Sequence, residues 1–365
     1  MIRVVLLCCL LLTSVSIIQA QTPTPEPSPT PNAGGHLVDV YLTRLPDGSD
    51  ELTLIDVLTG QTQSVTVTGE RYTIAGNVIV FFDYVTQKVM MLTSTGFVLP
   101  HPFITLEAGA KRVDWVIARD SRTIAWTQTF GTPDALRTIT YTANVDGTNR
   151  RELLRDGPRN GVRALPVTFD VEQTSLYMDM QPDGLSRLLP YPQYAGLFRV
   201  DLTTSQPETL PGEPACFCGA GLHADHYIRL TLTQDLGGFD VQIYDLRGRT
   251  QHTIPALMRP NFTQAGDILI APDGKQAIYA LSQVQNFGSV NQTVETVFIL
   301  IDLSTYTQRP LTDPISQTLH PLQWTEENTA VLLTDYNEEG TWKLRLEDGA
   351  LTQVAEGAYL GTLKN

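Results

Sequence analysis

The sequence predicts an all-β protein folded as a single β-propeller, with seven four-stranded blades. Three observations lead to this prediction. Short strands of alternating apolar and polar residues follow one another from His36 onward, without a convincing amphipathic helix. Two turn motifs alternate at intervals of about 40 to 55 residues, the period expected for four-stranded propeller blades. The first repeat lacks one strand, and the C-terminus offers a strand that can replace it.

Residues 1–20 have the pattern of a signal peptide. Arg3 supplies the basic start, residues 4–18 are apolar, and Ala20 is the small residue expected before a cleavage site. The apolar run of about 15 residues is shorter than the ~20 that span a bilayer, so an uncleaved membrane anchor is the lesser alternative. We therefore expect a secreted protein, extracellular or periplasmic, with no membrane insertion beyond this segment.

Residues 21–35 alternate proline with small polar residues. Such a segment favours the extended polyproline II conformation and buries no apolar surface, so it behaves as a disordered or semi-rigid spacer. We interpret it as a tether for the domain formed by residues 36–365. The alternative is a leader with no role of its own.

Two local patterns recur along this domain. In the first, an apolar strand leads through a polar turn into a second strand, as in residues 115–128 and 268–281. In the second, an alternating strand ends at an aspartate before a Thr, Ser or Gly turn. An aspartate there can accept hydrogen bonds from the turn backbone, which ends the strand. We assign this structural role to Asp56, Asp201, Asp245 and Asp302.

The patterns divide the domain into blades whose strands we letter a to d from the axis outward. Blades two to seven are predicted at residues 70–100, 112–155, 163–210, 215–257, 263–312 and 320–356. Residues 36–68 supply only strands b, c and d of blade one, and residues 358–363 can supply the missing a-strand. Joining both ends of the chain in one blade closes the ring and removes free edges. Six or eight blades remain alternatives, because blade two is short.

Two segments resemble the repeats of a known family. The run Ala271-Pro272-Asp273-Gly274-Lys275 resembles the Ser/Ala-Pro-Asp-Gly-Lys signature of TolB-like, WD-like propellers, and residues 139–154 resemble the end of such a repeat. Blade six alone carries the first motif in full; blade three has Arg119-Asp120-Ser121-Arg122 in its place, and blade seven has Thr325-Glu326-Glu327-Asn328. The resemblance implies the fold. Because the motif is a turn, it implies no site.

Charge and composition exclude some partners. The chain has 39 acidic and 25 basic residues, a net charge of -14, and no run of Lys or Arg. Nucleic acids and anionic membranes are therefore poor partners. Phosphate loops, zinc-binding helices and nucleophile elbows are absent from the sequence, and we expect no cofactor. We expect a monomer.

One segment, residues 215–227, gathers groups that bind metals. It contains Cys216, Cys218, His223, Asp225 and His226. Two thiolates and two imidazoles could hold zinc or copper, although the spacing matches no specific motif. The alternatives are a disulfide or redox pair, as expected in an exported protein, and inert thiols. The remaining histidines, which we interpret as loop residues, are His36, His101, His252 and His320.

Loop length predicts where binding takes place. In a propeller the b–c and d–a loops share one face, and here several b–c loops are long, at residues 128–137, 181–196 and 283–296. Long loops on a rigid scaffold usually carry recognition, and aromatic residues and arginine are enriched there. The candidate binding residues on this long-loop face are Phe130, Arg187, Tyr191, Tyr194, Phe287 and Tyr336. The alternative is that they only pack the loops.

Two functional classes follow. The first is a non-catalytic exported binding module that presents its long-loop face to a protein or glycan, consistent with the tether, the acidic charge and the missing catalytic motifs. The second is a secreted hydrolase or lyase with acid and base residues at the channel mouth. Residues from several blades can converge there, so linear motifs do not exclude an enzyme.

Overall fold

The alternating segments form strands as expected. The computed structural model describes residues 37–364 except 185–189, 224–225, 248–249 and 336–339. In the first strand, β1 (Leu37–Arg44), Val38, Val40 and Leu42 are buried while the residues between them are not. Successive side chains of a strand point to opposite faces, so this alternation places one face of the strand in the core.

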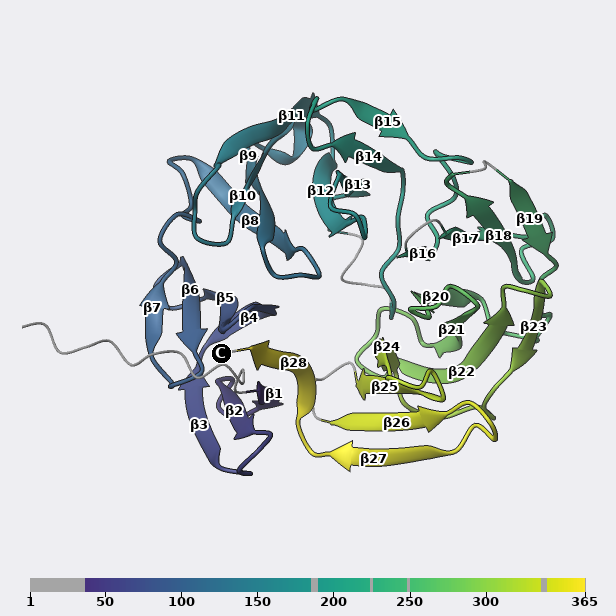
Figure 1. Ribbon diagram of the computed structural model, residues 1–365. Coiled ribbons are helices and arrows are strands. Elements are labelled where there is room, and N and C mark those ends of the chain that lie inside the picture. Colours follow the sequence, from purple (N-terminus) through teal and green to yellow (C-terminus); the bar gives the residue numbers. More distant parts are fainter. Residues whose placement is uncertain (1–36, 185–189, 224–225, 248–249, 336–339, 365) are drawn as a thin grey trace, which may run out of the picture. The chain divides into compact units, whose positions relative to one another are not determined.

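The described strands form seven four-stranded antiparallel sheets arranged in a ring (Figure 1). The prediction of a seven-bladed propeller is therefore confirmed. Blade one consists of β28 (Ala358–Lys364), β1, β2 (Asp50–Asp56) and β3 (Thr62–Val67). Blade two consists of β4 (Gly69–Ala75), β5 (Val78–Asp83), β6 (Lys88–Thr93) and β7 (Val98–Pro100). Blade three consists of β8 (Ala110–Ile117), β9 (Thr123–Phe130), β10 (Leu136–Asn144) and β11 (Arg151–Arg159).

The remaining blades repeat this order. Blade four consists of β12 (Val162–Phe169), β13 (Ser175–Pro182), β14 (Leu197–Asp201) and β15 (Pro207–Thr209). Blade five consists of β16 (Ala220–His223), β17 (His226–Leu232), β18 (Phe239–Asp245) and β19 (Gln251–Ile254). Blade six consists of β20 (Gln264–Ile270), β21 (Gln276–Gln285), β22 (Thr293–Asp302) and β23 (Thr307–Pro310). Blade seven consists of β24 (Leu319–Trp324), β25 (Ala330–Asp335), β26 (Thr341–Arg345) and β27 (Leu351–Ala355), and one short 3-10 helix, Pro133–Ala135, lies between β9 and β10.

Blade one closes the ring as predicted. Strand β28 pairs antiparallel with β1, from Leu37 opposite Lys364 to Leu42 opposite Ala358. The C-terminal segment thus supplies the a-strand that the first repeat lacks, and both ends of the described chain lie in one sheet.

The strand-ending aspartates have the predicted structural role. Asp302 accepts hydrogen bonds from the backbone of Ser304 (2.8 Å) and Thr305 (2.9 Å). Asp56, Asp201 and Asp245 accept equivalent bonds from the residues that follow them. The motif fixes the c–d turns, and the carboxylates of its aspartates are used in doing so.

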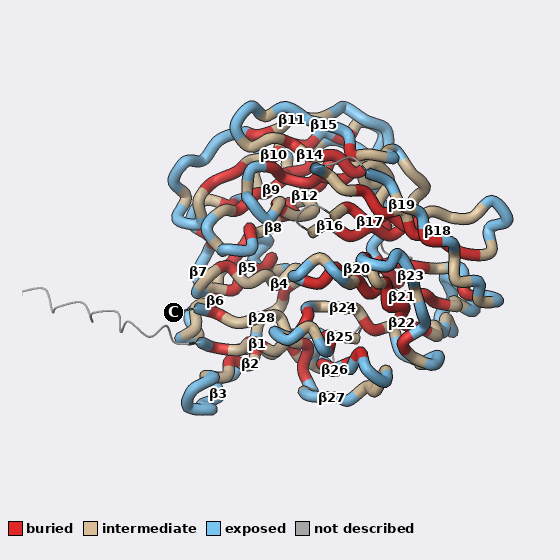
Figure 2. The backbone as a smooth tube through the Cα atoms, turned by 45° about the vertical axis from the view of Figure 1, so that its right-hand side comes forward, coloured by how far each residue is buried: buried red, intermediate tan, exposed pale blue. Residues whose placement is uncertain are grey.

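The core lies between neighbouring blades (Figure 2). In β21 the side chain of Tyr279 packs with Ile228 and Val241 of blade five, and the adjacent Ile278 packs with Val331 of blade seven. Blade six therefore buries both of its faces against its two neighbours, as expected in a ring of blades.

Two predictions concern the N-terminus. The signal peptide (residues 1–20) and the tether (residues 21–35) lie outside the described residues. Within the described ranges, no helix is long and apolar enough to cross a membrane.

Candidate functional site

The innermost strands of the blades carry irregularities in their pairing with the next strand. Each begins at the face that holds the b–c loops, the long-loop face, and we call these strand starts the inner rim. In the described residues, six of the seven innermost strands shift register against the next strand, β16 being the exception. Two of the shifts contain a non-glycine residue with left-handed backbone, Arg71 (φ 59°) and Asp267 (φ 54°). Such bulges redirect side chains, and they are frequent next to functional sites.

Two arginines of blades two and three share one carboxylate on this rim. The Nε atom of Arg112 donates to both oxygens of Asp114 (2.8 Å each), and Nη1 of Arg71 lies 3.2 Å from the same carboxylate. The Arg71 guanidinium also packs over the rings of Phe82 (5.2 Å) and Trp115 (5.0 Å). Burial lowers the pKa of Arg112, but the hydrogen bonds and charge of Asp114 outweigh it, so the pKa is raised. Nη2 of Arg71 also pairs with Glu70 at 2.7 Å, so the two arginines are balanced by two carboxylates.

A cavity of about 360 Å³ adjoins this pair, between blades three and four. Three cations line it, namely Lys111, Arg112 and Arg163. The Arg163 side chain is only 7% exposed and pairs with Asp183 at 3.2 Å. Lys111 is exposed and has no ion pair or hydrogen bond within the described part of the chain. We call this cavity the cationic pocket.

The cationic pocket lies on the only blade with an excess of basic residues. Residues 110–159, which form blade three, contain nine Lys and Arg against six Asp and Glu, whereas the whole chain has a net charge of -14. Three cations against one carboxylate, Asp183, give the pocket lining an excess of positive charge, and such a cavity attracts anions. The pocket is therefore suited to an anionic group.

The candidate aromatic residues lie on several blades. Phe130 ends β9, directly before the pocket residue Gly131, and is partly exposed. Phe287 is 53% exposed, between β21 and β22 of blade six. Arg187 and Tyr336 lie outside the described residues. Phe130 thus borders the cationic pocket, whereas Phe287 belongs to another part of the face.

Tyr191 is not a surface residue, which corrects the sequence interpretation. Its side chain is 2% exposed, and its hydroxyl contacts Ser282 and, at 2.7 Å, Thr296 of blade six. The loop that leaves blade four therefore reaches blade six, where the ring packs against core residues of blades six and seven. We call residues 190–195 the strap. Tyr191 anchors it.

Tyr194 also serves the strap. It is half-buried, and its backbone forms a two-way bridge with Cys218 (3.0 and 3.4 Å). Its carbonyl accepts a hydrogen bond from Arg229 (2.7 Å). Burial raises the pKa of the Tyr194 hydroxyl. The backbone contacts of this residue hold the loop in place.

Cys216 and Cys218 form a disulfide. The Arg229 side chain, 1% exposed, donates to the carbonyls of Cys216 and Cys218 at 2.7 Å each. It also pairs with the buried carboxylate of Glu213 at 3.0 Å. This cluster, the arginine clamp, fixes the segment between blades four and five.

The disulfide changes the metal hypothesis. Its sulfurs are not thiolates, so the set of Cys216, Cys218, His223 and His226 does not assemble as ligands. His223 donates from Nε2 to the Pro272 carbonyl (3.2 Å), and burial lowers its pKa. Asp225 lies outside the described residues. Among the residues that are described, no three His, Cys, Asp or Glu side chains are grouped to hold a metal ion.

His320 is not a loop residue as interpreted from the sequence. It lies in β24, and its Nδ1 hydrogen-bonds the carboxylate of Asp267, which stands in the bulge of β20. The ring of Tyr191 meets the imidazole edge-on at 5.7 Å. A His–carboxylate pair thus occupies the rim of blades six and seven.

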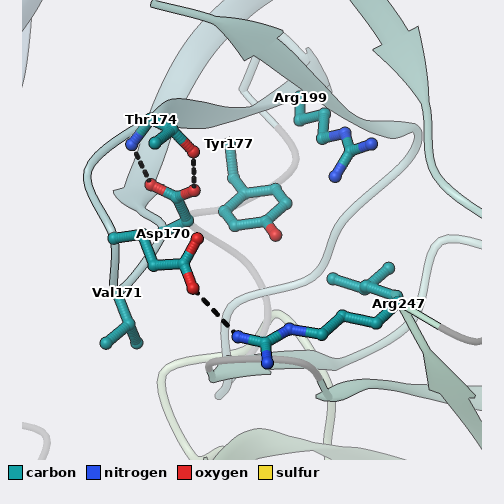
Figure 3. Close-up of a pocket in the computed structure, with 8 residues that line it drawn as sticks. Asp170, Val171, Thr174, Tyr177, Arg199 and Arg247 are labelled. Atoms are coloured by element: carbon teal, nitrogen blue, oxygen red, sulfur yellow. Dashed lines mark hydrogen bonds and ion pairs between the residues drawn. The ribbon is translucent and has the colours of Figure 1, made fainter.

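The face opposite the long loops has its own cavities. One of about 400 Å³ is lined by the ends of the innermost strands of blades three to seven, including Arg119, His223 and Trp324. Figure 3 shows a smaller neighbour of about 160 Å³, where Asp170 accepts hydrogen bonds from Thr174. In the same view the Arg247 side chain pairs with a carboxylate of Glu172 at 2.9 Å. These charged groups bind one another.

Sequence reasoning did not find the charged residues of the rim. Lys111, Arg112, Arg163 and Asp183 come from two blades, and no linear motif joins them. One signal was present, the basic excess of residues 110–159 in an acidic chain. Counting charges blade by blade would have located this part of the rim.

Comparison with known proteins supports the fold alone. Neither a protein-family model nor a curated protein matches the sequence. Among solved structures, a prolyl endopeptidase is similar over 88% of this chain and 50% of its own, at 10% identity and a TM-score of 0.58. An oligogalacturonate lyase in complex with manganese is similar over 82% of this chain and 87% of its own, at 10% identity and a TM-score of 0.51. TolB from Acinetobacter baumannii is similar over 90% of this chain and 82% of its own, at 13% identity and a TM-score of 0.44.

The chain spans about half the length of the prolyl endopeptidase that it matches. These neighbours differ in function, and all are distant in sequence. A propeller fold hosts many unrelated functions, so function has to be argued from the site.

Proposed function

We propose that this protein is an exported binding module whose long-loop face presents the cationic pocket to an anionic group of a glycan or protein partner. The observation that carries the proposal is the gathering of Lys111, Arg112 and Arg163 around one cavity in a chain of net charge -14. Export follows from the signal pattern of residues 1–20.

The chemistry of the pocket supports an anion. Guanidinium groups bind carboxylates and related anions through parallel charged hydrogen bonds, which are stronger than neutral ones. Lys111 has no partner in the described residues and can offer all three of its donors to a ligand. Asp183 and Asp114 hold the arginines in place and leave the pocket with a cationic excess.

Titration calorimetry with glucuronate, phosphate, sulfate and neutral glucose tests the proposal. We expect at least one anion to bind, with an affinity that falls as salt is added. Lys111→Gln should weaken that binding about tenfold, since a hydrogen bond to a charged group contributes about 1.5 kcal/mol or more. Lys343→Gln, an exposed lysine on β26 of blade seven, is the matched control. No binding of any anion, or equal loss in both variants, would refute the proposal.

One observation favours a second candidate, a hydrolase or lyase. The hydrogen bond from His320 Nδ1 to Asp267 orients the imidazole as in many general bases. The left-handed backbone of Asp267 is the kind of local strain that clusters at functional sites. Mass spectrometry of a bound ligand recovered after incubation tests this candidate. An enzyme would change the ligand, and His320→Gln would stop the change while the ligand still binds; an unchanged ligand supports the binding module.

A further inference from the structure

We infer that the cationic pocket takes a sugar acid, a molecule with a carboxylate beside several hydroxyl groups, such as a uronic acid unit of an acidic glycan. This inference rests on the proposed function and narrows it from any anion to one chemical class. It depends on two polar groups of the pocket that a bare anion does not use, Thr129 and Asp183.

Thr129 is the first of these groups. It lines the pocket from β9 and is 3% exposed, and its hydroxyl oxygen has no hydrogen-bond partner in the described residues. A buried hydroxyl without a partner costs roughly 1–3 kcal/mol, and such groups are rare in folded proteins. Rotation about the Cα–Cβ bond of Thr129 moves its hydroxyl group among the three staggered positions. In a position that faces the pocket, this hydroxyl can hydrogen-bond a hydroxyl group of a ligand.

Asp183 is the second group. Its carboxylate lies 3.2 Å from Arg163 and is 38% exposed, so one side is held by the protein and the other faces solvent. A carboxylate only accepts hydrogen bonds, and a ligand that meets it must therefore donate. Hydroxyl groups donate. Phosphate and sulfate esters present mainly acceptor oxygens and would be repelled.

The cations complete the match. Lys111 and Arg112 carry the positive charge on the side formed by blade three, and a planar carboxylate suits a guanidinium. The pocket therefore offers donors for one carboxylate and, beside them, an acceptor and a hydroxyl for neutral polar groups. A sugar acid has this combination within one ring.

The wall and the size of the pocket are compatible with such a ring. Gly131, Pro133 and Leu136 form one side, where the chain passes from β9 to β10. Gly131 has φ 90°, and a Cβ atom there would lie 2.2 Å from the Ala135 carbonyl oxygen, so this tight loop requires glycine. Pro133 and Leu136 offer apolar surface for ring C–H groups. The volume of about 360 Å³ is within the range of small-molecule sites.

Titration calorimetry with glucuronate, glucose, acetate and phosphate tests the inference on the wild type, Thr129→Val and Asp183→Asn. We expect glucuronate to bind at least tenfold more tightly than the other three. Thr129→Val keeps the shape of the side chain and removes the hydroxyl, so it should weaken glucuronate about five- to tenfold and leave acetate unchanged. Thr129→Ser should restore the affinity for glucuronate.

The controls separate this inference from the proposed function. Thr140→Val removes a buried hydroxyl of the neighbouring strand that bonds Thr127 at 2.7 Å, and it should not change the affinity for glucuronate. If phosphate or acetate binds as tightly as glucuronate, or if Thr129→Val has no effect, the sugar-acid inference is wrong while anion binding stands. If no anion binds the wild type, both fail.

Discussion

Two regions of the molecule are each built around a buried arginine, and they differ in what surrounds it. In the arginine clamp, Arg229 is bonded to three backbone carbonyls and to the buried Glu213. In the cationic pocket, Arg163 pairs with Asp183, which is partly exposed, and two neighbours, Lys111 and Thr129, have no partner in the described residues. A buried cation therefore does not mark a binding site by itself. Our proposal that the pocket binds an anion rests instead on Lys111, which is exposed and has no ion pair or hydrogen bond in the described residues.

The largest effect should come from breaking the clamp. Arg229→Met removes three charged hydrogen bonds and leaves Glu213 as an unpaired buried carboxylate, so we expect a loss of about 3–5 kcal/mol in the free energy of unfolding. Urea titration followed by tryptophan fluorescence measures it. Arg345→Met breaks an exposed pair with Asp348 and should leave the free energy of unfolding nearly unchanged. Equal costs for the two variants would show that the clamp is not structural.

The next effect concerns how closely the strap approaches blade six. A Cβ atom on Gly266 would lie 2.6 Å from Cβ of Tyr191 and 3.3 Å from the Pro192 carbonyl oxygen, too close for the strap to stay in place. Gly266→Ala should therefore cost about 1–3 kcal/mol in unfolding free energy and increase hydrogen exchange in residues 190–195. Gly196→Ala, where a Cβ atom would meet only Met180 at an ordinary 3.7 Å, controls for the general loss of a glycine. Unchanged exchange in the strap would contradict this account of its packing.

Asp179, which lies beside the clamp, should make the stability of the protein depend on pH. Burial raises the pKa of Asp179 to about 6, against the lowering effect of the backbone N–H groups of Gly196 and Ala195. The folded state therefore holds a proton that the unfolded state releases near pH 4, and this contribution to stability is lost as pH rises from about 4 to 6.

Asp179→Asn removes that loss, because an amide oxygen can still accept from both N–H groups. We expect the variant to be more stable than the wild type above pH 6, by about 1–2 kcal/mol, and to show no such gain at pH 4. Thermal unfolding at pH 4, 5, 6 and 7 measures the difference. If the difference in stability between the variant and the wild type were the same at all four pH values, Asp179 would not be the cause of the pH dependence.

The sequence predicted the fold well because its signals are local. Strand alternation depends on neighbouring residues, and an aspartate such as Asp302 bonds within three residues of itself. The closure by β28 was predictable for another reason, since a missing strand in one repeat requires a replacement. These features need no knowledge of where distant residues lie.

The strap and the site depend on distant contacts and could not be predicted in this way. The hydroxyl of Tyr191 hydrogen-bonds residues that lie 91 and 105 positions away in the sequence. From the sequence, this aromatic residue in a long loop resembled a recognition residue. In the structure it anchors the loop in the core. His320 likewise meets Asp267 across 53 positions. The bulges that direct Arg71 and Asp267 toward the rim have no signature in the strand pattern.

The smallest effect should come from Phe287, in the b–c loop of blade six on the long-loop face. Its side chain is exposed between β21 and β22, so Phe287→Ser should change the unfolding free energy by less than about 0.5 kcal/mol. Phe130 directly precedes the pocket wall, so Phe130→Ser should weaken anion binding measured by calorimetry, whereas Phe287→Ser should leave it unchanged. If both variants lost affinity for the anion equally, the ligand would extend across the whole long-loop face. The arginine clamp and the cationic pocket would then differ only in their contribution to stability.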